Sequence, residues 1–323
     1  MISTHHQLAR FAENVFWLAR YMERAENLAR ILDVTESFAR DQRGGPEWLP
    51  VLQLHADEAR FAERHDAATA AAVSAFYVLD RENPTSFVWA VRTARANARS
   101  LRHLISTEMW LQLNVFYNEV SALQQRDVAL DNLSRLCSRL KEGCQTHTGI
   151  IEGTLYRDEV WRFYQLGKYI ERADQTSRLL DITYHRLINV ELQQGSPPDV
   201  SQWNALLRSA AGYQAYRRTH PRGLSPETVA AFLIYDESFP RSMATCIGDV
   251  ARHFQHLNET HGLTVSRQIS ALLRRLKGQT MRRGKRRPRR SPDKLHEFVD
   301  DFQLQLMLLT EEMGRTYFAH EAG

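Results

Sequence analysis

The chain repeats one charged, helix-like segment, and this repeat constrains the fold more than any other feature of the sequence. Residues 18–34 read LARYMERAENLARILDV, and residues 166–182 read LGKYIERADQTSRLLDI, 148 positions later. Eight of the seventeen positions are identical, including the Glu-Arg dipeptides at 23–24 and 171–172. Self-similarity at this distance indicates two copies of one structural unit.

The similarity continues downstream in the same order. Two further patterns occur in both halves, offset by 155 or 156 residues: Trp-x3-Leu at 48–52 and 203–207, and Phe-x3-Asp-x3-Pro-x-Ser at 76–86 and 232–242. We therefore predict a single domain over residues 1–323 that contains two repeats, 1–150 and 154–323. The halves are expected to pack together, because a lone helical unit leaves an apolar face open.

The spacing of glycine and proline predicts an all-α fold. Neither residue occurs in 1–43, 85–142 or 168–194, and these stretches are rich in Ala, Leu, Arg, Glu and Gln. No segment shows the sustained alternation that is typical of a half-buried strand. The chain is predicted to be a multi-helix bundle made of two tandem pseudo-symmetric helical repeats, with about ten helices.

Some helix ends are predicted as well. Breaks are expected at 143–153, where glycines cluster, and near Pro240. Thr85 or Ser86 is expected to cap a helix that begins at Phe87, and Ser291 to cap the next helix after the basic stretch.

The net charge of +4 hides an uneven distribution. Residues 274–290 hold ten Lys and Arg and no acid, so the rest of the chain carries −6. The basic loop predicted at 277–290 is either an unstructured surface loop or a binding segment for RNA, an acidic partner or a membrane surface. It lacks the aromatic residues on which bases stack, which argues against nucleic acid.

Localisation is expected to be cytoplasmic. No apolar run approaches the ~18 residues of a membrane span, and the first residues lack the apolar core of a signal peptide. No membrane partner is predicted.

The sequence contains no recognisable catalytic or cofactor motif. Cys137, Cys144 and Cys246 are too few for a disulfide framework. Cys144 and His147 lie three apart on a predicted helix, but a metal would need another ligand from elsewhere, so buried or free thiols are preferred. There is no glycine-rich phosphate loop and no nucleophile motif. No catalytic residue, metal or cofactor is predicted.

The repeated Glu-Arg helix leaves three interpretations open. On a helical wheel Glu23 and Asn27 fall in a polar stripe, and Arg24 lies at the edge of the apolar face. The stripe is either solvated surface or a structural contact, in which Arg24 and Arg172 cap carbonyls or pair with a buried carboxylate such as Asp80 or Asp236. The structural interpretation is favoured, because the same charges recur in both copies.

The third interpretation is a binding site. If the two helices meet about a pseudo-two-fold axis, they present a cleft with paired Glu and Arg side chains. Arg binds a carboxylate bidentately and Glu binds an ammonium group, so such a cleft suits an amino acid or a peptide. The candidate binding residues are Glu23, Arg24, Asn27, Asn97, Glu171, Arg172 and Arg241. Arg241 follows Pro240 at a predicted helix start, where it is either a surface residue beside a cap or part of an anion site.

Four segments carry a resemblance to a known family. They are FWLARYMERAENLARILDV (16–34), ARANARSLRHLISTEMWLQLN (94–114), VWRFYQLGKYIERADQTSRLLD (160–181) and FLIYDESFPRSMATCI (232–247). Together they resemble the bacterial alpha-E family, helical proteins named for a Glu-Arg motif, and the resemblance covers most of the chain. It implies an all-helical fold, and it implies nothing about the basic stretch.

The resemblance also implies a biochemical setting. Members of this family tend to accompany an ATP-grasp ligase-like protein and a transglutaminase-like cysteine peptidase, which suggests a pathway that forms or processes peptides. We therefore expect an accessory or binding component of such a pathway. The alternatives are an enzyme that uses Glu23 or Glu171 as a general base on an aminoacyl or peptide substrate, and a protein that binds nucleic acid or an acidic partner through the basic loop.

Overall fold

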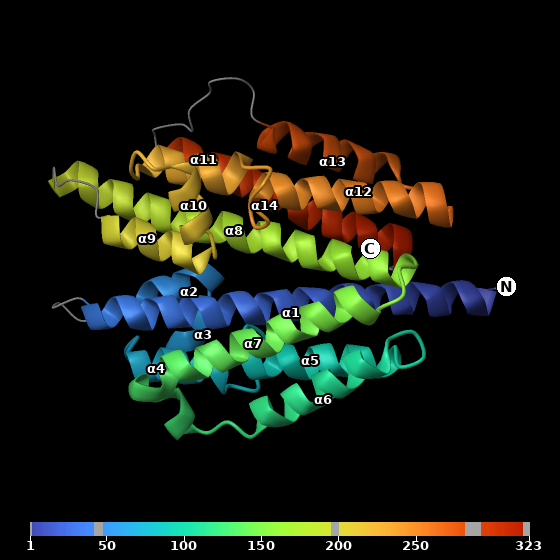
Figure 1. Ribbon diagram of the computed structural model, residues 1–323, viewed down its shortest axis with the longest axis horizontal. Coiled ribbons are helices and arrows are strands. Elements are labelled where there is room, and N and C mark those ends of the chain that lie inside the picture. Colours follow the sequence, from blue (N-terminus) through green and yellow to red (C-terminus); the bar gives the residue numbers. More distant parts are fainter. Residues whose placement is uncertain (1, 42–47, 195–199, 282–291, 319–323) are drawn as a thin grey trace. The chain divides into compact units, whose positions relative to one another are not determined.

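The structure is a computed structural model of the 323-residue chain, and it describes residues 2–41, 48–194, 200–281 and 292–318. Over these ranges it contains fourteen α-helices, one 3₁₀ helix and no strand (Figure 1). The predicted all-α class is confirmed, and the expected number of about ten helices is too low.

The chain divides by compactness into two units. One unit is Trp17–Tyr156, and the other combines Met1–Phe16 with Arg157–Gly323. The long first helix, α1 (Ile2–Asp41), contributes to both units. The pseudo-symmetric repeats at 1–150 and 154–323 stay a prediction, because compactness does not decide them.

The unit Trp17–Tyr156 joins the second part of α1 to short helices and one long helix. These are α2 (Leu49–His55), α3 (Glu58–Ala62), α4 (Ala70–Val78), α5 (Phe87–Ser100), α6 (Thr107–Ser121), the 3₁₀ helix η1 (Gln125–Val128) and α7 (Leu130–Thr154). Helix α6 packs against both α5 and α7. Helix α1 meets α5 through an edge-on contact of the Tyr21 and Trp89 rings, 5.3 Å between centroids.

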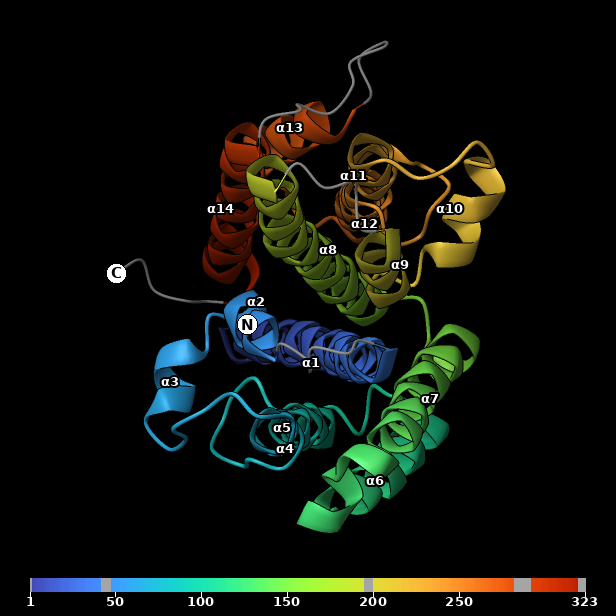
Figure 2. The ribbon, with the colours of Figure 1, turned by 90° about the vertical axis from the view of Figure 1, so that its left-hand side faces the viewer.

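The other unit is organised around α8 (Glu159–Gln194). It further contains α9 (Val200–Ser209), α10 (Tyr213–Thr219), α11 (Pro226–Tyr235), α12 (Met243–His261), α13 (Arg267–Thr280) and α14 (Pro292–Tyr317). Helix α8 packs along α12 and α14, and α13 packs against α12 and α14 (Figures 1 and 2). Because α13 continues to Thr280, the first residues of the predicted basic loop are helical; positions 282–290 lie outside the described residues.

The helix break predicted at 143–153 is wrong. Helix α7 runs through Gly143, Gly149 and Gly153 without interruption. A Cβ atom placed on Gly143 would lie 2.2 Å from the ring of Phe116 on α6, whereas nothing lies within 4 Å of one on Gly149 or Gly153. Gly143 therefore serves the close approach of two helices and not a turn.

Serine caps mark several helix starts that the glycine and proline pattern does not show. The stretch 85–142 is broken after Ser100, and α6 begins where Ser106 Oγ accepts the N–H of Met109. Ser86 caps α5 as predicted, accepting the N–H of Trp89 at 3.2 Å. Thr85 is not the cap, since it lies one residue before the N-cap position, and its hydroxyl donates to Asp57 at 2.6 Å. The break predicted near Pro240 is confirmed, and the predicted cap Ser291 lies outside the described residues.

Candidate functional site

On α1, the first Glu-Arg pair lies in a network of side-chain contacts. Glu23 is only 4 % exposed, and Asn27 Nδ2 donates to Glu23 Oε1 at 3.4 Å. The guanidinium carbon of Arg24 lies 5.9 Å from the centre of the Tyr21 ring, within the range of a cation–π contact. The interpretation of the stripe as solvated surface is therefore wrong for Glu23 and Asn27.

On α8, the second Glu-Arg pair has the same local contacts. Glu171 is fully buried, and Gln175 Nε2 donates to Glu171 Oε1 at 3.1 Å. Arg172 lies over Tyr169 at 5.7 Å, and the ammonium group of the buried Lys168 lies 4.7 Å from the centre of the same ring. In each copy, the amide four residues after the glutamate and the tyrosine three residues before the arginine thus hold the Glu-Arg pair in a fixed local geometry.

The aspartates at the far end of each motif connect the helix to neighbours in its own unit. Asp33 accepts a hydrogen bond from Ser134 at 2.7 Å and pairs with Lys141, both on α7. Asp181 accepts a hydrogen bond from His296 of α14 at 2.9 Å. Hydrogen bonds to charged groups contribute about 1.5 to 3 kcal/mol each, so these contacts help fix where the Glu-Arg helices lie in their units.

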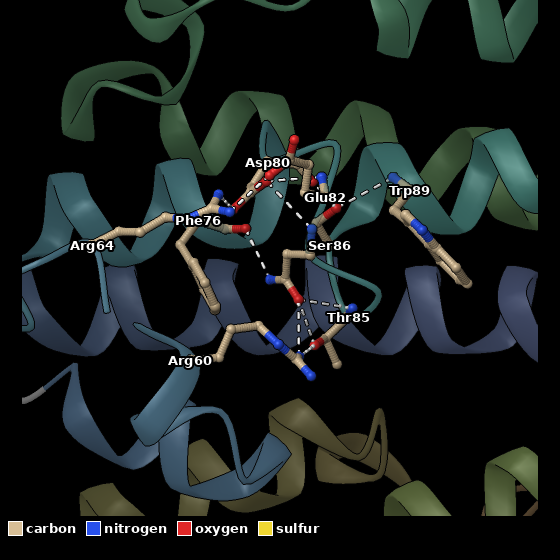
Figure 3. A network of polar contacts seen from close by, with 9 residues as sticks. Arg60, Arg64, Phe76, Asp80, Glu82, Thr85, Ser86 and Trp89 are labelled. Carbon is tan, nitrogen blue, oxygen red and sulfur yellow. Dashed lines mark hydrogen bonds and ion pairs between the residues drawn. The ribbon is translucent and has the colours of Figure 1, made fainter. Parts of the chain in front are cut away.

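The carboxylates of Asp80 and Asp236 do not pair with Arg24 and Arg172, so this part of the structural interpretation is wrong. Each aspartate instead closes a turn. Asp80 Oδ1 accepts the backbone N–H groups of Glu82 and Asn83, and its other oxygen pairs with Arg64 (Figure 3). These bonds use the carboxylate locally, as an Asx turn does.

The turn at Asp236 has the same construction. Asp236 Oδ1 accepts the N–H groups of Ser238 and Phe239, at 2.9 and 3.0 Å. Ser242 caps α12 and donates to the backbone carbonyl of Asp236, as Ser86 caps α5 and donates to that of Asp80. The Phe-x3-Asp-x3-Pro-x-Ser pattern is thus a turn between two consecutive helices, and its final serine is the N-cap of the second helix.

Of the two outlying candidates, one lies beside a Glu-Arg helix and one does not. Arg241 is buried, and its backbone carbonyl accepts a hydrogen bond from Thr176 of α8 at 2.9 Å. Asn97 is half-buried on α5 and makes no described contact with Glu23 or Arg24. Because Glu23 and Arg24 belong to one unit and residues 171–172 to the other, the cleft of paired side chains stays a prediction.

Among the residues that the structure describes, no cysteine belongs to a group that could hold a metal ion. Cys137 and Cys144 are buried on α7, and burial raises the pKa of Cys137 to about 12. Burial also raises the pKa of Cys144, and the negative charges of Glu26 and Glu23 raise it further. His147 Nδ1 is within hydrogen-bonding distance of the Gln112 side chain, 3.0 Å away. Thiols with such raised pKa values are poor ligands and poor nucleophiles at neutral pH.

A different group brings metal-binding atom types together. Asp181, His296 and Asp300 place one ligand atom each within 4.8 Å of one another. The hydrogen bond to Asp181 raises the pKa of His296. His296 Nδ1 lies 2.9 Å from Asp181 and its Nε2 lies 3.3 Å from Asp300, and the raised pKa favours the charged ring. This arrangement is an ionic contact between α8 and α14.

Sequence reasoning missed several polar residues around the Glu-Arg helices. Lys168 and Gln175 could have been found, since they replace Arg20 and Asn27 in the repeat. The Asp181–His296 contact joins residues 115 positions apart, and no local sequence pattern predicts it. His253, buried on α12 beside Tyr169, was missed for the same reason.

In the residues that the structure describes, no helix is both long enough and apolar enough to cross a membrane. Comparisons with curated proteins and with solved structures found no match. A model of the Alpha-E family, described as a predicted alpha-helical domain with a conserved ER motif, matches residues 8–318. The Glu-Arg dipeptides on α1 and α8 both lie within the matched range, and with this match over almost the whole length, the chain belongs to the Alpha-E family.

Proposed function

We propose that this protein is a binding component of a pathway that forms or modifies peptides. It would act with an ATP-grasp ligase-like protein and a transglutaminase-like protein, and hold an amino-acid or peptide ligand. The observation that carries the proposal is the Glu-Arg pair of each unit, in which the glutamate is buried and accepts a hydrogen bond from the amide four residues further on, while the arginine is half-buried. Preorganised carboxylate and guanidinium groups suit a ligand that has both an ammonium and a carboxylate group.

The state of the cysteines supports a binding role over thiol catalysis. Cys137, Cys144 and Cys246 are all buried. A nucleophilic cysteine needs a lowered pKa, but burial raises the pKa of Cys137 to about 12 and that of Cys144 well above its usual value. The peptide bond chemistry is therefore assigned to the partners.

The partnership can be tested by affinity purification from the native organism. The tagged full chain should recover the ATP-grasp protein, measured by quantitative mass spectrometry. The ligand site is tested separately on the purified chain, where replacing both Glu23→Gln and Glu171→Gln should weaken the binding of a dipeptide at least tenfold, measured by isothermal titration. The matched control is the double variant Glu26→Gln and Asp174→Asn, which changes acids that form ion pairs with Arg30 and Arg178 on the same helices. Circular dichroism and thermal melting establish that both double variants fold.

Two results would contradict the proposal. If the wild-type chain never recovers the ATP-grasp protein, the accessory role is wrong. If the Glu23→Gln and Glu171→Gln variant binds the dipeptide as tightly as the control does, the Glu-Arg pairs are not the binding groups.

A further inference from the structure

A cluster of cationic and aromatic side chains lies where the start of α8 runs alongside α12 (Figure 1). The indole ring of Trp161 meets the His253 ring edge-on, with centroids 5.2 Å apart. The guanidinium groups of Arg157 and Arg162 lie 5.3 and 4.8 Å from the centre of the same indole ring. We call Arg157, Trp161, Arg162 and His253 the Trp161 cluster.

Two buried donors in this cluster meet no acceptor. Trp161 is 8 % exposed, and its indole N–H has no hydrogen-bond partner. The Nε–H of Arg162 is also buried and has none. A buried donor left without an acceptor costs about 1 to 3 kcal/mol, and most buried polar groups are paired. Two such donors in one cluster require an explanation beyond packing.

The cluster also has an excess of positive charge. Neither Arg157 nor Arg162 pairs with a carboxylate in the part of the chain that the structure describes. The nearby acids are engaged elsewhere: Asp158 with the backbone N–H of Trp161, Glu159 with His261, and Asp249 with Arg252. A partly buried guanidinium without a counter-ion is costly.

Within the cluster, His253 orients the side chain of Arg162. Nη1 of Arg162 donates to Nδ1 of His253 at 3.4 Å, which requires a neutral imidazole. Burial, and then the charge of Arg162, lower the pKa of His253 to about 3, so this ring stays neutral near pH 7. With Nη1 used by His253, Arg162 retains its Nε–Nη2 edge for a ligand. That edge is one of the two forks with which arginine binds carboxylates and phosphates bidentately.

We propose that the Trp161 cluster is a binding site for an oxyanion, namely the carboxylate or phosphate group of a small ligand. One oxyanion would accept the Trp161 indole N–H and the free edge of Arg162, and its charge would balance Arg162 and Arg157. His253 is a positioning residue, because it holds Arg162 by one nitrogen. The inference goes beyond the proposed pathway, and it does not depend on either partner protein.

The test uses the purified full chain, with inorganic phosphate and acetate as probes and chloride at matched ionic strength as the baseline. In the wild-type protein, the indole ¹H–¹⁵N resonance of Trp161, assigned by its absence in Trp161→Phe, should shift saturably with at least one probe. Isothermal titration should give at least tenfold weaker binding for Trp161→Phe, which removes only the donor. It should give a similar loss for Arg162→Lys, which keeps the charge but lacks the Nε–Nη2 edge.

Arg218→Lys is the matched control, because Arg218 is an exposed arginine on α10 in the same unit, and it should bind like the wild type. A response to phosphate alone assigns the site to a phosphorylated ligand, and a response to acetate alone assigns it to a carboxylate. The proposal is overturned if neither probe binds saturably. It is equally overturned if folded Arg162→Lys and Trp161→Phe, checked by circular dichroism, bind as tightly as Arg218→Lys. Because partners are absent, failure here leaves the pathway proposal standing.

Discussion

His147 is a fully buried histidine on α7, and its environment makes the stability of the protein depend on pH. Burial lowers its pKa to about 4, against about 6.5 in an unfolded chain. Between these values the unfolded chain binds a proton that the folded chain does not. The free energy of unfolding should therefore fall as the pH drops from about 6.5 towards 4, by up to about 1.4 kcal/mol per pH unit. His253, with its pKa lowered to about 3, acts in the same direction.

Denaturant unfolding at pH 7, 6 and 5 measures this slope. His147→Gln removes the titrating group but keeps a side chain that can bond to Gln112, so its stability should fall less steeply with acid than that of the wild type. Adding His253→Gln should flatten the slope further. An unchanged slope in His147→Gln would show that this histidine is not neutral in the folded protein.

The two N-cap serines offer a second test at the level of single residues. Ser86 and Ser242 are fully buried, and each accepts a backbone N–H while donating to an aspartate carbonyl. Ser86→Ala and Ser242→Ala should each lower the free energy of unfolding by about 1 to 2 kcal/mol, measured by urea denaturation. Ser100→Ala, at the exposed end of α5, is the control and should change it by less than about 0.5 kcal/mol. Equal effects at Ser86 and Ser100 would contradict the capping role.

Local chemistry of this kind could be predicted from the sequence, and contacts between distant residues could not. Ser86 was predictable as a cap because capping depends on neighbours within three residues. Glu23 with Asn27 was predictable because residues four apart share one helix face. The orphan donors of Trp161 and Arg162 were not, since their lack of an acceptor depends on how α8 packs against α12.

At the level of helices, two glycines of α7 allow the effect of side-chain packing on stability to be measured apart from the effect of helix propensity. Gly143→Ala would place a methyl group 2.2 Å from the buried ring of Phe116, so α6 and α7 would have to shift. We expect a loss of about 1 to 3 kcal/mol in the free energy of unfolding, despite the better helix propensity of alanine. On the same helix Gly149 has open space, and Gly149→Ala should stabilise the protein by about 0.5 to 1 kcal/mol. Thermal or urea unfolding of the two variants should therefore change in opposite directions.

The same glycine shows why some helix ends were predicted wrongly. Glycine has a low helix propensity, but Gly143 occurs within α7 because only glycine leaves room for the Phe116 ring. A single sequence does not show such tertiary contacts. Conversely, the breaks after Ser100 and Ser121 carry no glycine or proline. They are set by caps such as Ser106, a weaker signal because serine is common elsewhere.

At the level of the whole molecule, the helical class was predictable and the division into units was not. Three long stretches without glycine or proline suffice to predict a helical fold, because each one must satisfy its backbone groups internally. The boundary between Phe16 and Trp17 falls inside α1, where no loop or composition change marks it. It follows from which residues pack together, and the repeat suggested a boundary only near 150.

This division predicts how the chain behaves when it is cut. Tyr156 is exposed in the loop between α7 and α8, so a specific protease site inserted before Arg157 should be cleaved readily. Fragments 1–156 and 157–323 should then elute together in gel filtration. The reason is that residues 1–16 belong to the compact unit of the second fragment, where the buried Phe16 ring lies 5.4 Å from that of Phe318.

Two variants of α1 test that reason. Phe16→Ala removes the buried ring, a change that costs about 3 to 5 kcal/mol in a packed core, and it should weaken the association of the fragments at least tenfold. Arg10→Ala, at an exposed position of the same segment, should leave the association unchanged. If the fragments separate in the wild-type protein, or if Phe16→Ala associates like Arg10→Ala, the first sixteen residues do not hold the second unit. The unit would then have to be completed by α8 to α14 alone.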